Sequence, residues 1–269
     1  MNVISKSVFT LILGVFGLLL PMKGMSETPK IGIVILHGKS GSPTKHVSDL
    51  ASTLEAKGYL VANLEMPWSG NRDYDASVSA AEAQVEAALS SLRNKGAQKV
   101  FVSGHSQGGA FTLHFAGKHA VDGIICIAPG GNVGSKSFRE KLGGSVERAR
   151  QLVVEGKGDE KTKLEDFEGK KGTYPVVTTP AVYLTWFDPE GAMNSKRAAH
   201  AANPRVPILW IVAQRDYPGL RETNLPMFAS LPKNPHTRLY EPSSDHLGAP
   251  SASIDEIVRW TSKVASTGR

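Results

Sequence analysis

Apolar runs and amphipathic stretches alternate along most of this 269-residue chain. The runs are short and mostly apolar, and they lie at 31–36, 59–64, 100–102, 124–127 and 206–213, with a shorter one at 237–240. Helical spacing of apolar residues follows at Val47, Leu50, Ala51 and Leu54 before Gly58, at Ala81, Val85, Ala88 and Leu92 before Gly96, and at Ile254, Ile257, Val258 and Val264. The short apolar runs are typical of strands buried on both faces of a parallel sheet, and the helical spacing is typical of helices that cover such a sheet. The pattern predicts an α/β protein with a mostly parallel central sheet and helices on both faces.

One long segment interrupts this alternation, between the runs at 124–127 and 206–213. It covers residues 130–203 approximately, and its middle, Glu155–Lys171, is dense in glycine and in charges of both signs. Such a composition favours solvent over a packed core. We therefore expect a solvated loop or a mobile helix end over Glu155–Lys171.

The first residues have the pattern of an export signal. Lys6 provides the positive charge, Val8–Leu20 is an apolar core, and Gly24-Met25-Ser26 places small residues at a cleavage position. The apolar core is short for a membrane span, although an uncleaved anchor or a core helix is the alternative interpretation. We expect a signal peptide at 1–26, a single domain at 27–269, a periplasmic or secreted location, and no stable membrane anchor after cleavage.

Charge and cysteine content exclude several other classes. The formal net charge is +6, and no basic run interleaved with aromatic residues indicates nucleic-acid binding. The one cysteine, Cys126, lies inside an apolar run, so we expect a buried thiol and no intramolecular disulfide. No spacing typical of a metal site, a phosphate-binding loop or a dinucleotide fingerprint occurs, so we expect neither a metal nor a cofactor.

A serine stands where a strand passes into a helix. Gly104-His105-Ser106-Gln107-Gly108 follows the run at 100–102, and a helix is predicted over Ala110–Ala120. A nucleophile on so sharp a turn has strained backbone angles, and side chains at the two flanking positions would clash, whereas glycines do not. The turn predicts an exposed Ser106 hydroxyl and directs the N–H of Gln107 toward the place where an oxyanion would form.

A second turn follows the run at 31–36. His37-Gly38-Lys39 begins it, and glycine allows the backbone to approach a reacting carbonyl. We expect the N–H of Lys39 to be the second oxyanion donor, with an ordinary turn as the alternative.

An acid and a base are predicted further along the chain. Asp216 follows the run at 206–213, and His246 lies after the run at 237–240. Both loops leave the carboxyl ends of strands, where open α/β sheets place their sites. Asp245 and Asp188 are rival acids, but a neighbouring residue reaches the Nδ1 atom of its own histidine with difficulty, and Asp188 follows no core strand.

The remaining histidines have other expected places. His37 belongs to the glycine turn and His105 to the serine turn, as a packing residue. The others, expected on helices or surface loops, are His46, His114, His119, His200 and His236.

The order Ser106, Asp216, His246 resembles that of the α/β-hydrolase superfamily, in its serine-nucleophile, esterase- and lipase-like branch. The resemblance covers nearly all of the chain after the signal segment. It implies Ser106 as nucleophile, His246 as base, Asp216 as the acid that orients it, and the amides of Gln107 and Lys39 as oxyanion hole. It also implies that the segment at about 130–203 is a small cap over the site.

The resemblance implies a serine hydrolase that cleaves a carboxylic ester of a small molecule. A peptidase, thioesterase, acyltransferase or carbon–carbon hydrolase would use the same residues, and a non-catalytic binding module would belong to a different class. Five large side chains are candidates for the substrate pocket or, alternatively, for a small core that holds the cap: Met66, Trp68, Tyr183, Trp186 and Phe187.

Overall fold

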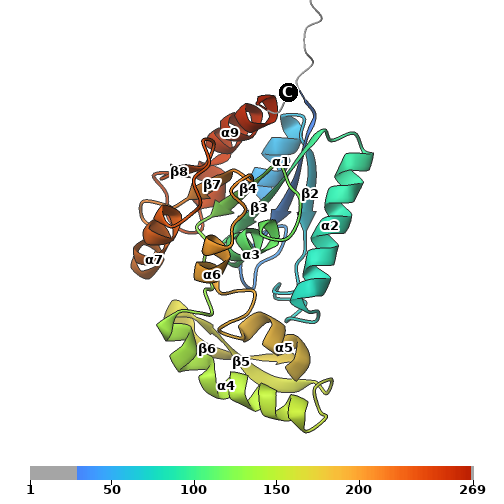
Figure 1. Cartoon of the computed structure of the whole chain (residues 1–269), viewed down its shortest axis with the longest axis vertical. Helices are drawn as coiled ribbons and strands as arrows, with labels where there is room; N and C mark the ends of the chain where they lie inside the picture. The colour runs from blue at the N-terminus through green and yellow to red at the C-terminus, as the bar shows by residue number, and fades with distance from the viewer. Residues whose placement is uncertain (1–28, 268–269) are drawn as a thin grey trace, which may run out of the picture.

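The computed structural model describes residues 29–267 of the chain (Figure 1). The expected signal segment at 1–26 lies outside the described residues. Between residues 29 and 267, no helix combines the length and the apolar character needed to cross a membrane.

A parallel sheet forms the centre of the molecule. Its strands are β1 (Ile31–Leu36), β2 (Leu60–Leu64), β3 (Lys99–His105), β4 (Gly123–Ile127), β7 (Ile208–Ile211) and β8 (Arg238–Tyr240). Their order across the sheet is β2-β1-β3-β4-β7-β8, and every neighbouring pair is parallel. The expected α/β fold with a mostly parallel sheet is confirmed.

Helices cover both faces of the sheet (Figure 1). Those of the core are α1 (Ser48–Ala56), α2 (Val78–Asn94), α3 (Gln107–Ala116), α6 (Ser195–His200), α7 (Pro218–Ala229), α8 (Ala249–Ala252) and α9 (Ile254–Ser266). Strand β1 shows the division, because Ile33 and Ile35 pack with α1 and α9, whereas Val34 and Leu36 pack with α2 and α3. Side chains alternate along a strand, so each face of the sheet has its own core.

The chain reverses direction across the sheet between β1 and β3. Strand β2 lies on one side of β1, and the strands from β3 onward lie on the other side. A ligand in an open α/β sheet binds at the carboxyl ends of the strands that flank such a reversal. In this chain those ends lead into the turn at His37 and into Ser106.

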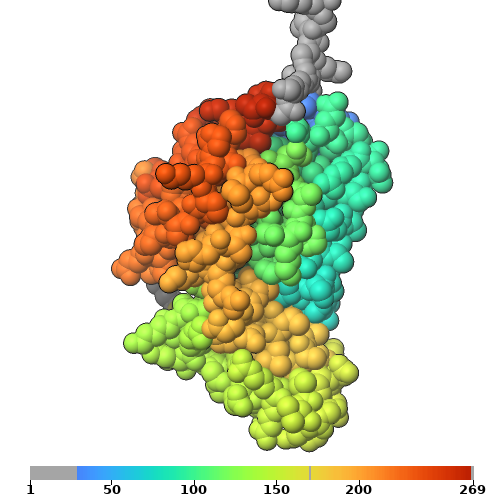
Figure 2. All heavy atoms as spheres, viewed as in Figure 1, coloured from blue at the N-terminus to red at the C-terminus, as the bar shows by residue number. Residues whose placement is uncertain are grey.

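The chain leaves the sheet between β4 and β7 and builds a separate lobe. This cap lobe consists of α4 (Lys136–Val154), β5 (Thr162–Glu168), η1 (Gly169–Lys171), β6 (Gly172–Thr178) and α5 (Pro180–Phe187). Figure 2 shows it projecting from one end of the core. Helix α6, which belongs to the same insertion in sequence, packs against α3 and α7 of the core.

The loop expected over Glu155–Lys171 is wrong in its second half. Residues 162–168 form strand β5, which pairs antiparallel with β6. Lys163 and Glu165 of this strand are exposed and alternate with Leu164 and Asp166, which are buried. The exposed charges therefore lie on the outer face of the hairpin. The high charge content predicted a loop, although buried and exposed positions alternate with the period of two that is typical of a strand.

The helix after the serine also begins earlier than expected, at Gln107 instead of Ala110, and it ends at Ala116. Gly108 and Gly109 lie in its first turn despite the low helical propensity of glycine. A β-carbon on Gly108 would lie 2.6 Å from the carbonyl oxygen of His37, so the close approach of β1 requires glycine there.

Candidate active site

Ser106 stands at the junction of β3 and α3 in a conformation that side chains seldom adopt. Its φ is 53° and its ψ is −117°. The turn is this tight because Gly104 has no side chain. A β-carbon on Gly104 would lie 2.1 Å from the oxygen of Gly108, which is a clash. Both flanking glycines are therefore required, and the strain at Ser106 is held by the packing of strand against helix.

Three side chains from separate loops form a chain of hydrogen bonds. His246 Nε2 lies 3.1 Å from Ser106 Oγ, and His246 Nδ1 lies 2.8 Å from Asp216 Oδ1. His246 is 7% exposed and Asp216 is 5% exposed. Residues separated by up to 140 positions in sequence are thus brought together at the carboxyl edge of the sheet.

The direction of these bonds follows from their partners. An ionised carboxylate only accepts hydrogen bonds, so Nδ1 of His246 donates to Asp216. In a neutral imidazole the other nitrogen then carries a lone pair, and Nε2 accepts from the Ser106 hydroxyl. Asp216 Oδ1 also accepts from the N–H of Tyr217 across 2.7 Å, which fixes the carboxylate.

The two rival acids make other contacts. Asp245 Oδ1 accepts from the N–H of Gly248 across 2.8 Å and closes the turn after His246. Asp188 ends helix α5 in the cap lobe, where its Oδ1 accepts from the N–H of Glu190 and lies 3.4 Å from Arg150.

Two aromatic rings flank His246. The ring centroids of His105 and Tyr217 each lie 4.9 Å from that of His246. His105 is 3% exposed, and its Nε2 donates to the carbonyl oxygen of His246 across 2.9 Å. Burial, together with the nearby His246, lowers the pKa of His105 to about 3, so this ring is neutral at pH 7.

The two expected oxyanion donors lie next to the elbow. Gln107 is the first residue of α3, and a β-carbon on Gly38, just before Lys39, would lie 3.2 Å from Ser106 Cβ. Within residues 29–267, no acceptor is hydrogen-bonded to the backbone N–H of Lys39 or Gln107. These N–H groups are free to donate to an oxygen near Ser106.

The His37 ring stabilises the turn at Gly38 and Lys39 through two hydrogen bonds. It is completely buried, its Nδ1 donates to the oxygen of Gly38, and its Nε2 accepts from the N–H of Met66 across 3.0 Å. Burial lowers the pKa of His37, which keeps the ring in the neutral form that this pair of bonds requires.

Gly130 lies beside the serine and places no side chain there. A β-carbon on Gly130 would lie 3.3 Å from Ser106 Oγ and 3.6 Å from Leu220 Cδ2. Leu220 and the half-exposed Tyr217 belong to the start of α7, and the exposed Leu247 follows His246. Apolar side chains therefore border the approach to Ser106 on this side.

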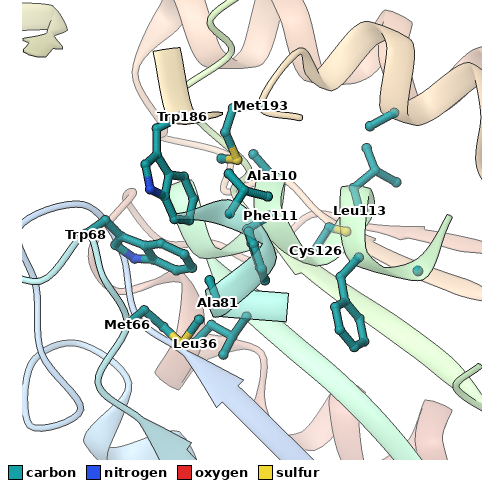
Figure 3. Packing of buried hydrophobic residues seen from close by; sticks show 14 of the residues in the cluster. Leu36, Met66, Trp68, Ala81, Ala110, Phe111, Leu113, Cys126, Trp186 and Met193 are labelled. Carbon is teal, nitrogen blue, oxygen red and sulfur yellow. The ribbon is translucent and has the colours of Figure 1, made fainter. Parts of the chain in front are cut away.

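The five side chains considered for a substrate pocket lie in the core instead. Met66, Trp68, Tyr183, Trp186 and Phe187 are each no more than 3% exposed. Figure 3 shows the indoles of Trp68 and Trp186 meeting beside Phe111, and the centroids of the two Trp rings are 5.5 Å apart. The contact of Trp68 with Trp186 of the cap lobe fits the second of the two roles considered, a small core that holds the cap.

Two polar residues of this region were not identified from the sequence. Asp166 of β5 is fully buried and lies 2.5 Å from Lys39 Nζ, and Tyr74 Oη lies 2.9 Å from Asp166 Oδ2. The alternation of period two in residues 162–168 is a signal that could have identified Asp166 as inward-facing. Tyr74 carries no such signal.

A metal centre and a reactive thiol are the two other kinds of site to consider among residues 29–267. Between residues 29 and 267, no cluster of three or more His, Cys, Asp or Glu side chains could hold a metal ion. Cys126 is buried and unpaired, and burial raises the pKa of its thiol, so it stays protonated.

Comparison with known proteins adds a family, a relative and a fold. A family model described as serine aminopeptidase, S33, matches residues 27–242. Esterase EstD of Thermotoga maritima is 24% identical over 209 residues, which are 72% of this chain and 48% of that protein. The chain thus spans about half the length of this curated relative.

Two solved structures illustrate the likeness in fold. The monoacylglycerol lipase of Paleococcus ferrophilus has a TM-score of 0.60 and 18% identity, and the match covers 87% of this chain and 94% of that one. Est1E of Butyrivibrio proteoclasticus, bound to ferulic acid, has a TM-score of 0.60 and 15% identity, and the match covers 90% and 92%.

Proposed function

The chain belongs to the serine aminopeptidase S33 family of α/β-hydrolases, and from this premise we propose that it is a serine hydrolase that cleaves a carboxylic ester of a small molecule. The observation that carries the proposal is the hydrogen-bonded series Ser106, His246, Asp216 at a strained elbow. A hydroxyl, an imidazole and a carboxylate in this order can generate a nucleophile at neutral pH.

The reaction begins with transfer of the Ser106 proton to His246 Nε2. Ser106 Oγ attacks the ester carbonyl, and the negative charge on the carbonyl oxygen is stabilised by the N–H groups of Lys39 and Gln107. Asp216 holds His246 in the required tautomer and stabilises the imidazolium. His246 then gives the proton to the leaving alcohol, and water activated by the same imidazole hydrolyses the acyl-enzyme.

Ester hydrolysis is favoured over aminopeptidase activity by the relative and by the charges near the site. The curated relative is an esterase. An aminopeptidase must bind the free amino group of its substrate, and a carboxylate is the usual partner for such a cation. Asp166, the buried carboxylate beside the Lys39 turn, is already paired with Lys39 and has no free charge to offer.

A fluorophosphonate probe and a substrate panel test the proposal. We expect labelling at Ser106 alone, loss of labelling in Ser106→Ala, and turnover of p-nitrophenyl esters with an optimum in acyl length. Turnover of aminoacyl amides without esters would favour a peptidase, thioester turnover would favour a thioesterase, and transfer of the acyl group to an alcohol would favour an acyltransferase. A folded wild type that neither labels nor turns over any substrate would favour a binding module.

Export is a further part of the proposal and rests on residues 1–26. We expect the protein recovered from the periplasm or the medium to begin at Glu27. An intact N-terminus on the recovered protein, shown by mass spectrometry, would contradict cleavage.

A further inference from the structure

A buried carboxylate of the cap lobe binds the side chain of one proposed oxyanion residue. Asp166 Oδ1 accepts from Lys39 Nζ across 2.5 Å and from the N–H of Phe167 across 2.6 Å. Lys39 Nζ also donates to the oxygen of Phe167, and it lies 5.3 Å from the ring centroid of Phe138. The Lys39 side chain thus leaves the core and ends in a site built by the cap lobe.

The other oxygen of the same carboxylate leads to the second oxyanion residue. Asp166 Oδ2 accepts from the hydroxyls of Tyr74 and Tyr174, each across 2.9 Å. The Tyr74 hydroxyl has a second acceptor, Gln107 Oε1, at 3.2 Å, and its one hydrogen is shared between the carboxylate and this amide oxygen. One carboxylate therefore contacts Lys39 directly and Gln107 through a single hydroxyl.

Tyr74 is fixed in place by the surrounding structure. Its φ is 57°, a conformation that is rare for bulky residues and persists only where the neighbours enforce it. Thr178 Oγ1 of β6 donates to the oxygen of Tyr74 across 2.6 Å, and the rings of Tyr74 and Phe187 lie 4.9 Å apart. The cap lobe thus holds both the backbone and the ring of Tyr74.

The two tyrosines that bond to Asp166 are neutral. Burial, followed by the charge of Asp166, raises the pKa of both Tyr74 and Tyr174, so their hydroxyls remain protonated donors. Of the four donors to the Asp166 carboxylate, Phe167 and Tyr174 belong to the cap lobe, whereas Lys39 and Tyr74 come from outside it.

Stability alone is a weak reason for such a cluster. Burying an ion pair costs desolvation that its attraction roughly offsets, and apolar side chains of similar size often stabilise a protein more. The buried side-chain pair Lys39 and Asp166, 10% and 0% exposed, specifies a geometry instead. That geometry involves Lys39 and Gln107, the two residues proposed as oxyanion donors.

On the basis of the function proposed above, we infer that Asp166 is a positioning residue of the oxyanion hole. Its carboxylate holds Lys39 directly and Gln107 through Tyr74, and so fixes both N–H donors relative to Ser106. The oxyanion hole then depends on the docking of the cap lobe, because the carboxylate that positions the two donors belongs to that lobe. The donors are needed most when charge develops on the carbonyl oxygen, so their displacement affects kcat more than KM.

Kinetics of Asp166→Asn and Tyr74→Phe on a p-nitrophenyl ester test this inference. We expect a decrease of kcat of about 10- to 100-fold for Asp166→Asn, with KM within about 2-fold of wild type. Displacing an oxyanion donor should reduce kcat less than removing that donor completely. Tyr74→Phe keeps the ion pair and removes the hydroxyl that bonds to both Asp166 Oδ2 and Gln107 Oε1, so kcat should fall about 10-fold, again without a change of KM.

Two variants serve as controls. Tyr174→Phe removes an equal hydroxyl bond to Asp166 Oδ2 with no bond to Gln107, so its effect on kcat should be smaller than that of Tyr74→Phe. Asp122 accepts from Lys99 Nζ and from the N–H of Val100, so Asp122→Asn removes a similar set of bonds on the core. Asp122→Asn should leave kcat unchanged.

Rates are compared per folded protein, measured by circular dichroism. If Asp166→Asn fails to fold, the comparison of Tyr74→Phe with Tyr174→Phe decides. A wild-type kcat in both Asp166→Asn and Tyr74→Phe, or equal losses in Tyr74→Phe and Tyr174→Phe, would overturn the positioning role alone. A wild type that neither labels with fluorophosphonate nor turns over any ester would overturn the proposed function, and the inference with it.

Discussion

His105, the residue before the proposed nucleophile, is hydrogen-bonded to the backbone of the proposed base. Its Nε2 lies 2.9 Å from the carbonyl oxygen of His246, and a carbonyl only accepts, so Nε2 carries the hydrogen. The elbow therefore fixes the loop of His246 from the side of β3. The bond requires no charge on His105, whose pKa is lowered to about 3 by burial and then by His246.

The lowered pKa of His105 predicts a pH dependence of stability. Between about pH 3 and pH 6.5 the unfolded chain binds a proton at this residue and the folded protein does not, so acid favours unfolding. In this window the free energy of unfolding of wild type should fall with decreasing pH faster than that of His105→Gln, by about 1 kcal/mol per pH unit. Urea unfolding at several pH values between 7 and 4.5 measures both, and parallel curves would contradict the prediction.

The acid assignment predicts a large difference between two neighbouring aspartates. Asp216→Asn should fold normally and lose about 10⁴-fold in kcat, because the amide no longer fixes the tautomer of His246. Asp245→Asn should change kcat little, since its carboxylate bonds to the N–H of Gly248. Steady-state kinetics on one ester compare the two variants, and the reverse order of effects would show that Asp245 is the acid.

The space beside Ser106 predicts an effect of a single methyl group. In Gly130→Ala the added β-carbon lies 3.3 Å from Ser106 Oγ, where the substrate must approach. We expect kcat/KM to fall about 10-fold, more for branched than for linear acyl groups, with little change in melting temperature. Gly219→Ala in α7 is the control, because its β-carbon meets no atom within 4 Å. Equal rates for Gly130→Ala and wild type would place the substrate elsewhere.

Helix α4 of the cap lobe predicts a stabilising substitution. Gly143 lies in the helix interior, is exposed, and has no atom within 4 Å of an added β-carbon. Gly143→Ala should raise the free energy of unfolding by about 0.5–1 kcal/mol through helix propensity and a less flexible unfolded chain. Gly134→Ala should have the opposite effect, because its β-carbon would lie 2.4 Å from Asn194 Nδ2. Urea denaturation measures both, and a destabilised Gly143→Ala would show an unrecognised contact.

The sequence by itself determined the sheet and the place where the polar residues meet. Apolar runs separated by amphipathic stretches can bury their surface only as parallel strands between helices. The loops after such strands lie at one edge of the sheet, which predicts that Ser106, Asp216 and His246 lie close together. The glycines around Ser106 added the strained turn, because the steric limits of the backbone are local.

The tertiary structure decided which polar and aromatic side chains are buried. Asp166 lies in a segment rich in charge, where a carboxylate is expected to face solvent. It is buried because β5 pairs with β6 and because Lys39 contacts it. Trp68 and Trp186 could have lined a pocket or filled a core, since the same apolar surface suits both, and the docking of the cap lobe placed them in the core. Periodicity is a property of neighbouring residues, whereas burial depends on the surface that covers them.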